Sequence, residues 1–186
     1  MIPAPSTDLT LYYVENFGVG EDGFEIPADI VDWDTSDVIA MASTFAGADT
    51  FNLNIGNWDT STVTTMVNMF GNAAIFNQDI GRFETGTVTD LMQMFRGAAE
   101  FNQDIGAWDT SSVTNMWGMF FRATAFNQDI GGWYTGNVNF ISYMFFSAEA
   151  FDQDIAAWDI SNLQDAEGMF DNSGVSTASF DAALEG

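Results

Sequence analysis

Large apolar residues return every 25 positions along this 186-residue chain. One such column holds Trp33, Trp58, Phe83, Trp108, Trp133 and Trp158. Isoleucine recurs from Ile30 to Ile155, phenylalanine from Phe45 to Phe170, and valine or leucine from Val38 to Leu163, with no insertion. One repeat cannot bury its apolar face alone, so four columns in register predict stacked coils with a continuous core.

The repeat divides the chain into three parts. We expect an N-terminal cap at 1–25, a six-coil domain at 26–175 and a C-terminal cap or tail at 176–186. Each coil is one 25-residue unit, so coil one is 26–50 and coil six is 151–175.

The spacing of apolar residues changes inside each coil. Val63, Met66, Phe70 and Ala73 have the spacing of one helix face, after Asp59, a residue type that caps helices. Residues 76–83 have the pattern of extended chain, which would pair with its neighbours as a parallel sheet. The sequence therefore predicts a leucine-rich-repeat-like solenoid of six coils, each with a short parallel β-strand and a short helix.

The repeat unit FNQDIGAWDTSSVTNMWGMF at 101–120 resembles that of the BspA-type surface proteins. Coil one departs from this pattern at Ile26–Asp29, and coil five at Trp133–Gly136. The resemblance implies a leucine-rich-repeat-like fold and a role in cell-surface adhesion or protein binding. It also implies an extracellular or cell-surface location, although Met1–Pro5 has neither the charge nor the apolar run of a signal peptide.

The composition excludes several classes of function. Three basic residues stand against 27 acidic ones, a net charge of −24, so we expect no nucleic-acid partner. No apolar run is long enough for a membrane span. Without His, Cys or Lys, the usual nucleophilic and Schiff-base mechanisms are excluded. A pair of carboxylates could still hydrolyse glycosides, but acids that recur identically in every coil favour structure, so we expect no enzyme.

Two polar columns suggest an alternative function. One acidic column contains Asp79, Asp104, Asp129 and Asp154. These carboxylates could hold Ca²⁺ between coils, or they could accept hydrogen bonds from turn amides, and we favour the turns. Thr35, Thr60, Thr85, Thr110 and Thr135 form a second column. Such an array could bind ice, although each Thr lies beside an expected helix cap. We expect no cofactor, with Ca²⁺ at the Asp79 column as the alternative.

Aromatic residues break the repeat pattern in coils four and five. If Val138, Ile141 and Phe145 face inward, Tyr143 and Phe146 face outward. Five such residues should gather on one face: Trp117, Phe121, Phe140, Tyr143 and Phe146. They could dock a partner, or they could fold over the backbone or meet the C-terminal tail. We favour docking, so the sequence predicts a non-enzymatic interaction module for a protein partner or a larger assembly.

Overall fold

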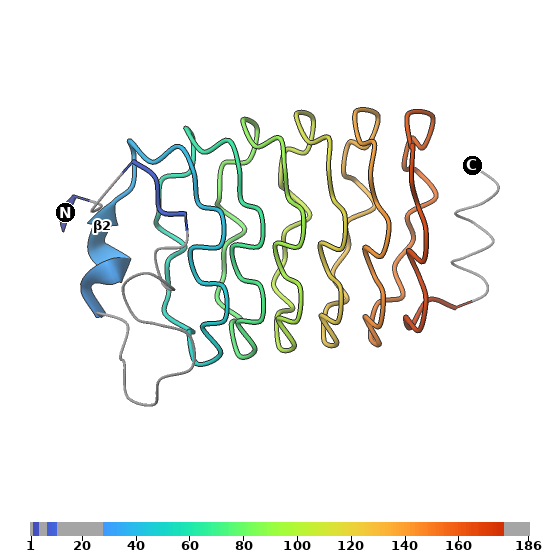
Figure 1. The fold of residues 1–186 in the computed structure, drawn as a ribbon, viewed down its shortest axis with the longest axis horizontal. Helices are drawn as coiled ribbons and strands as arrows, with labels where there is room; N and C mark the ends of the chain where they lie inside the picture. Colours follow the sequence, from blue (N-terminus) through green and yellow to red (C-terminus); the bar gives the residue numbers. More distant parts are fainter. Residues whose placement is uncertain (1, 4–6, 11–27, 177–186) are drawn as a thin grey trace.

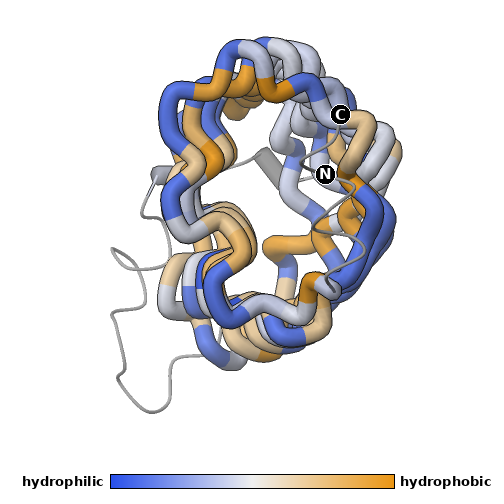
Figure 2. Tube along the Cα trace, turned by 90° about the vertical axis from the view of Figure 1, so that its right-hand side faces the viewer, coloured by the Kyte–Doolittle hydropathy of each residue, from blue (hydrophilic) through white to orange (hydrophobic). Residues whose placement is uncertain are grey.

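The computed structural model describes residues 2–3, 7–10 and 28–176, and its coils lie side by side in one row (Figure 1). Seen along the row, successive coils follow nearly the same outline (Figure 2). At the N-terminal end, β1 (Ile2–Pro3) pairs in parallel with β2 (Trp33–Asp34), which follows the 3₁₀ helix η1 (Ala28–Asp32). Most of the expected caps at 1–25 and 176–186 lies outside the described residues.

The prediction of a strand and a helix in every coil is wrong. Within the described residues, β1, η1 and β2 are the only regular elements, and the rest of each coil consists of turns and irregular backbone. Single parallel bridges connect consecutive coils, through Ala40, Thr65, Asp90, Asn115, Phe140 and Asp165. The chain therefore does not form a leucine-rich-repeat-like solenoid of strands and helices.

The segment expected to be helical bonds instead to the next coil. The N–H groups of Met66, Asn68 and Phe70 donate to carbonyls 24 residues ahead, at 3.2, 2.8 and 2.9 Å. An α-helix would use these N–H groups for carbonyls four residues back. Asn68 and Asn72 have positive φ values of 52° and 58°, which no α-helix contains. We call this bonded segment of each coil the backbone ladder.

The opposite side of each coil, where a sheet was expected, is held largely by side chains. The amide oxygen of Asn52 accepts the backbone N–H of Asn77 at 3.0 Å, and the Thr60 hydroxyl donates to the Glu84 carbonyl at 3.0 Å. Asn52, Asn77, Asn102 and Asn127 recur at 25-residue intervals, a pattern that predicts an amide ladder bonded to the backbone of neighbouring coils. That prediction is confirmed, because the same bond recurs from Asn77, Asn102 and Asn127 to the following coil.

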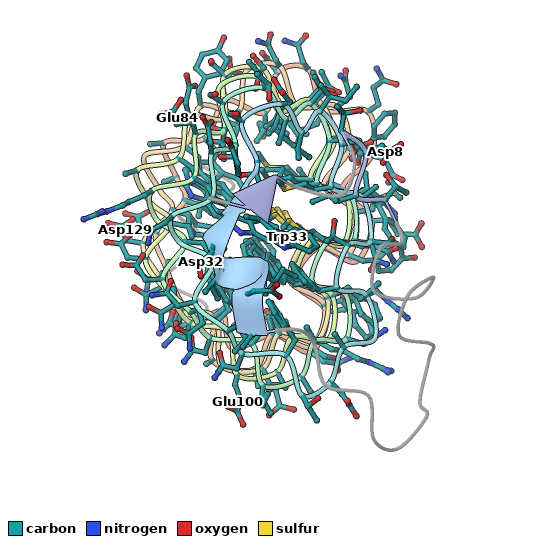
Figure 3. All side chains as sticks on the ribbon, turned by 90° about the vertical axis from the view of Figure 1, so that its left-hand side faces the viewer. Asp8, Asp32, Trp33, Glu84, Glu100 and Asp129 are labelled. Atoms are coloured by element: carbon teal, nitrogen blue, oxygen red, sulfur yellow. The ribbon has the colours of Figure 1, made fainter. Side chains whose placement is uncertain are left out.

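The apolar columns form one continuous core inside the stack. Ile55, Val63 and Phe70 are completely buried, and Trp58 is 3% exposed. The Trp58 indole N–H donates to the Ile30 carbonyl at 3.0 Å, so this buried polar group is satisfied. Viewed along the stack, methionine sulfur atoms lie inside it, whereas Glu84, Glu100 and Asp129 lie on its outside (Figure 3). The prediction that these columns face inward is confirmed.

Candidate interaction surface

The backbone ladder places Phe121 and Phe146 directly one above the other. The N–H of Gly97 donates to the Phe121 carbonyl at 2.7 Å, and the N–H of Arg122 donates to the Phe146 carbonyl at 2.8 Å. The ring centroids of Phe121 and Phe146 are 4.8 Å apart and their planes differ by 8°. The two rings therefore stack at the spacing that the backbone sets.

The other predicted aromatic residues join this pair. Tyr143 makes edge contacts with Phe146 and with Trp117, at centroid distances of 6.1 and 5.8 Å. Phe140 is 40% exposed, and with Trp117 it lines a shallow depression of about 430 Å³. Met92, Gln93 and Asn115 complete this depression. The structure thus brings all five rings together, and we call them the aromatic patch. Four of them are half-buried rather than freely exposed.

Two of the three arginines of the chain lie against the patch. The guanidinium carbons of Arg122 and Arg96 are 5.3 and 5.7 Å from the centroid of the Phe121 ring. Contacts of this kind attract a cation to the ring face. Arg96 lies in the same 25-residue column as Phe121, but the sequence pattern did not predict the contact of its guanidinium with the ring. The 25-residue interval between Arg96 and Phe121 was the available signal.

Tyr143 is held by the coil that follows it. A hydrogen bond with the Glu167 side chain raises the pKa of the Tyr143 hydroxyl above its ordinary value. A Cβ atom at Gly168 would lie 2.7 Å from the Tyr143 ring, so the ring rests on the backbone of coil six. Tyr143 also has a φ of 57°, which is rare for a bulky residue. Tyr143 therefore covers the backbone of the next coil, as the alternative interpretation expected, and it also contacts the other rings of the patch.

The acidic column proposed for Ca²⁺ makes a repeated turn contact. The Asp79 carboxylate accepts the N–H of Gly81 at 2.9 Å, and Asp104, Asp129 and Asp154 accept equivalent N–H groups at 2.9–3.0 Å. In the described part of the chain, no three acidic side chains gather in a way that could hold a metal ion. These contacts support the turn interpretation over the calcium interpretation.

A second acidic column, which contains Asp34, Asp59, Asp109 and Asp159, makes similar contacts. The Asp59 carboxylate accepts hydrogen bonds from the Ser61 hydroxyl and N–H at 2.6 and 2.9 Å. The bond from the hydroxyl is the larger cause of a pKa below the ordinary value for Asp59. The expected helix cap is therefore a turn of a few residues, with no helix after it.

The threonine column is buried rather than presented to solvent. Thr60 and Thr85 are each 1% exposed, and their hydroxyls donate to the carbonyls of Glu84 and Asp109 in the next coil, both at 3.0 Å. Thr35, Thr110 and Thr135 make equivalent bonds. Because these hydroxyls are used between coils, the column forms no outer surface for ice.

The turn contacts of the acidic column predict a non-specific response to ions. Millimolar CaCl₂ should raise the melting temperature only slightly, and NaCl at equal ionic strength should do nearly as well, because both screen the net charge of −24. Thermal unfolding in the two salts checks this. A stoichiometric calcium isotherm in calorimetry, with stabilisation that follows mass action, would contradict it.

Comparison with protein families decides where this chain belongs. The family model described as Mycoplasma protein of unknown function, DUF285, matches residues 16–105 and again residues 80–182. The chain belongs to the DUF285 family. The BspA-type assignment is not confirmed, although DUF285 shares the repeated character that led to it. Neither the curated proteins nor the solved structures contain a match. Within the described residues of this DUF285 chain, no helix is long and apolar enough to cross a membrane.

Proposed function

We propose that this DUF285 chain is a non-enzymatic interaction module, for adhesion or scaffolding, which docks a protein partner through the aromatic patch. The proposal rests on four rings in mutual contact on two adjacent coils, with Phe140 lining the depression beside Trp117. In other coils the column of Phe121 and Phe146 holds small or polar residues, namely Gly71, Arg96 and Asp171. The core does not need these rings, since other coils form it without them.

A surface of this kind suits protein recognition. Interface hot spots are enriched in aromatic residues and arginine, which the patch combines. Four of the five rings are half-buried, so little of their conformational entropy remains to be lost on binding. An extracellular or cell-surface location follows from adhesion and is part of the proposal.

Glycoside hydrolysis, and the binding of Ca²⁺ or ice by repeated columns, have less structural support than partner binding. The acidic residues of the Asp79 column have the same hydrogen bond in successive coils, whereas a carboxylate pair that hydrolyses glycosides needs two different environments. The Thr60 column is buried and the Asp79 column is engaged in turns. The irregular aromatic patch is the feature that distinguishes two coils from the rest.

Removing the stacked pair should remove partner binding. We expect Phe121→Ala and Phe146→Ala each to weaken partner binding by about 1–3 kcal/mol, because each truncates a ring near the centre of the patch. Crosslinking and capture from the native source, followed by titration of the captured partner, measure this effect.

An exposed ring elsewhere supplies the matched control. Tyr134 is 53% exposed and lies outside the patch, so Tyr134→Ala should retain full capture. Circular dichroism of each variant must show an unchanged fold. Undiminished capture by folded Phe121→Ala/Phe146→Ala would place the binding surface elsewhere and end the proposal.

A further inference from the structure

The column through the aromatic patch is complementary to its own reverse. At successive 25-residue intervals it contains Arg96, Phe121, Phe146 and Asp171, on coils three to six. A cation stands at one end, an acid at the other, and two stacked rings lie between them. Arg96 is half-buried against Phe121, and Asp171 is exposed. When the column is inverted and placed against itself, each charge therefore meets the opposite charge and each ring meets a ring.

From this column we infer that the patch binds a second copy of this chain, face to face and antiparallel. The inference rests on the proposed function, because it uses the same surface. A twofold axis parallel to the coils and passing between coils four and five sets each column against its own reverse. Arg96 then faces Asp171 of the second copy, twice, and Phe121 faces Phe146 of the second copy. Such a self-complementary patch is what a twofold dimer requires.

The spacing of the column makes this match possible along its whole length. Every residue of the column has a carbonyl that accepts an N–H from the preceding coil. The four distances, from Asn72, Gly97, Arg122 and Ser147, are 2.6, 2.7, 2.8 and 2.8 Å. Because one bond repeats at each step, the steps are equal, and two copies have the same step. The end charges and the central rings can therefore align at the same time.

The neighbouring column sets long side chains against glycines under the same inversion. It contains Gln93, Gly118, Tyr143 and Gly168 at the same intervals. The same twofold axis puts Tyr143 of one copy opposite Gly118 of the other, and Gln93 opposite Gly168. Gly118 is itself buried, and the nearest atoms to a Cβ built there lie 3.5 and 3.7 Å away, on Gln93 and Phe121.

The charges also select the direction of packing. If the two copies ran parallel with this column facing itself, Arg96 would face Arg96 and Asp171 would face Asp171, and like charges repel. Each copy also has a net charge of −24, which opposes association over long distances. Salt screens that long-range repulsion more than the close ion pairs, so dimerisation should strengthen as NaCl rises.

Charge exchange within the column tests the arrangement. The experiment is sedimentation equilibrium of the full chain across protein concentration and NaCl, with circular dichroism of every variant. Wild type should form a dimer. Arg96→Asp and Asp171→Arg should each raise the dimer Kd by about tenfold or more, since each places like charges opposite one another. The double variant Arg96→Asp/Asp171→Arg should restore the wild-type Kd to within about threefold, because the pairs are re-formed with reversed sign.

The outcomes separate this inference from the proposed function. A wild-type chain that stays monomeric at every concentration and salt overturns the second copy as occupant. The proposed function survives that result if the chain still captures another protein and Phe121→Ala/Phe146→Ala abolishes the capture. A dimer that the double charge variant fails to restore also overturns the antiparallel arrangement. A dimer unaffected by Phe121→Ala/Phe146→Ala would show that the patch is not its interface.

Discussion

Phe95→Ala is expected to lower the free energy of unfolding by about 3–5 kcal/mol, as loss of a buried aromatic ring does. The Phe95 ring is completely buried in coil three. Its ring centroid lies 3.9 Å from that of Phe101. The centroids of Phe70 and Phe120, in the coils before and after it, are 5.7 and 5.6 Å away. Its removal leaves a cavity that touches three coils. Since each coil is stabilised only by its neighbours, the stack on both sides loses support.

Urea denaturation of the variant and the wild type measures this loss. Tyr134→Ala is the matched control, because it truncates an aromatic ring that is 53% exposed. A surface change of this kind should alter stability by no more than about 0.5 kcal/mol. Equal urea midpoints for Phe95→Ala and Tyr134→Ala would mean that the buried phenylalanine column does not stabilise the core.

The sequence predicted which side chains are buried better than it predicted the backbone. Val63, Met66 and Phe70 were assigned to the interior from their spacing, and all three are completely buried. Their spacing reports only that the side chains share one side of the chain. A row of tight turns, such as the one closed by the Met69 N–H on the Met66 carbonyl, gives the same spacing as a helix. Burial was therefore predictable and the helix was not.

A signal for the turns was present in the repeat. Glycine and asparagine recur at Gly47, Asn72 and Gly97, where φ is positive, and these residue types tolerate positive φ best. Arg122 and Ser147 stand in the same column and also have positive φ, although neither residue type favours it. The turn is therefore visible only when several coils are compared. The hydrogen bonds that replace the helix join residues 24 positions apart, and local spacing contains no information about them.

The same distinction holds for the aromatic patch. The contact between Phe121 and Phe146 follows from one column and one interval, so the sequence was sufficient to predict it. The positions of Arg96 and Arg122 over the Phe121 ring depend on side-chain rotamers, which periodicity does not specify. The depression beside Phe140 depends in the same way on how the Trp117 side chain lies.

Gly106→Ala is expected to lower the free energy of unfolding by about 1–3 kcal/mol, as overpacking in a tight contact does. A Cβ atom at Gly106 would lie 2.6 Å from the carbonyl oxygen of Asp129 in the next coil. Backbone cannot move aside as a flexible side chain can, so the two coils must separate locally. A Cβ atom at Gly81 or Gly131 would lie 2.8 or 2.6 Å from the equivalent carbonyl oxygen of the next coil, and one at Gly56 would also clash with that of Asp79. Coil six, the last in the described part of the chain, has Ala156 at this place.

Gly132→Ala is the matched control for Gly106→Ala, because the two substitutions should change the free energy of unfolding in opposite directions. A Cβ atom at Gly132 meets no atom within 4 Å, so the same substitution adds no clash there. Replacing glycine by alanine at an unstrained position commonly stabilises a protein by about 0.4–1 kcal/mol, because the unfolded chain loses conformational freedom. Urea denaturation should therefore show Gly106→Ala below the wild type and Gly132→Ala at or above it. If both variants are stabilised alike, the coils do not approach as closely at Gly106 as the Asp129 contact requires.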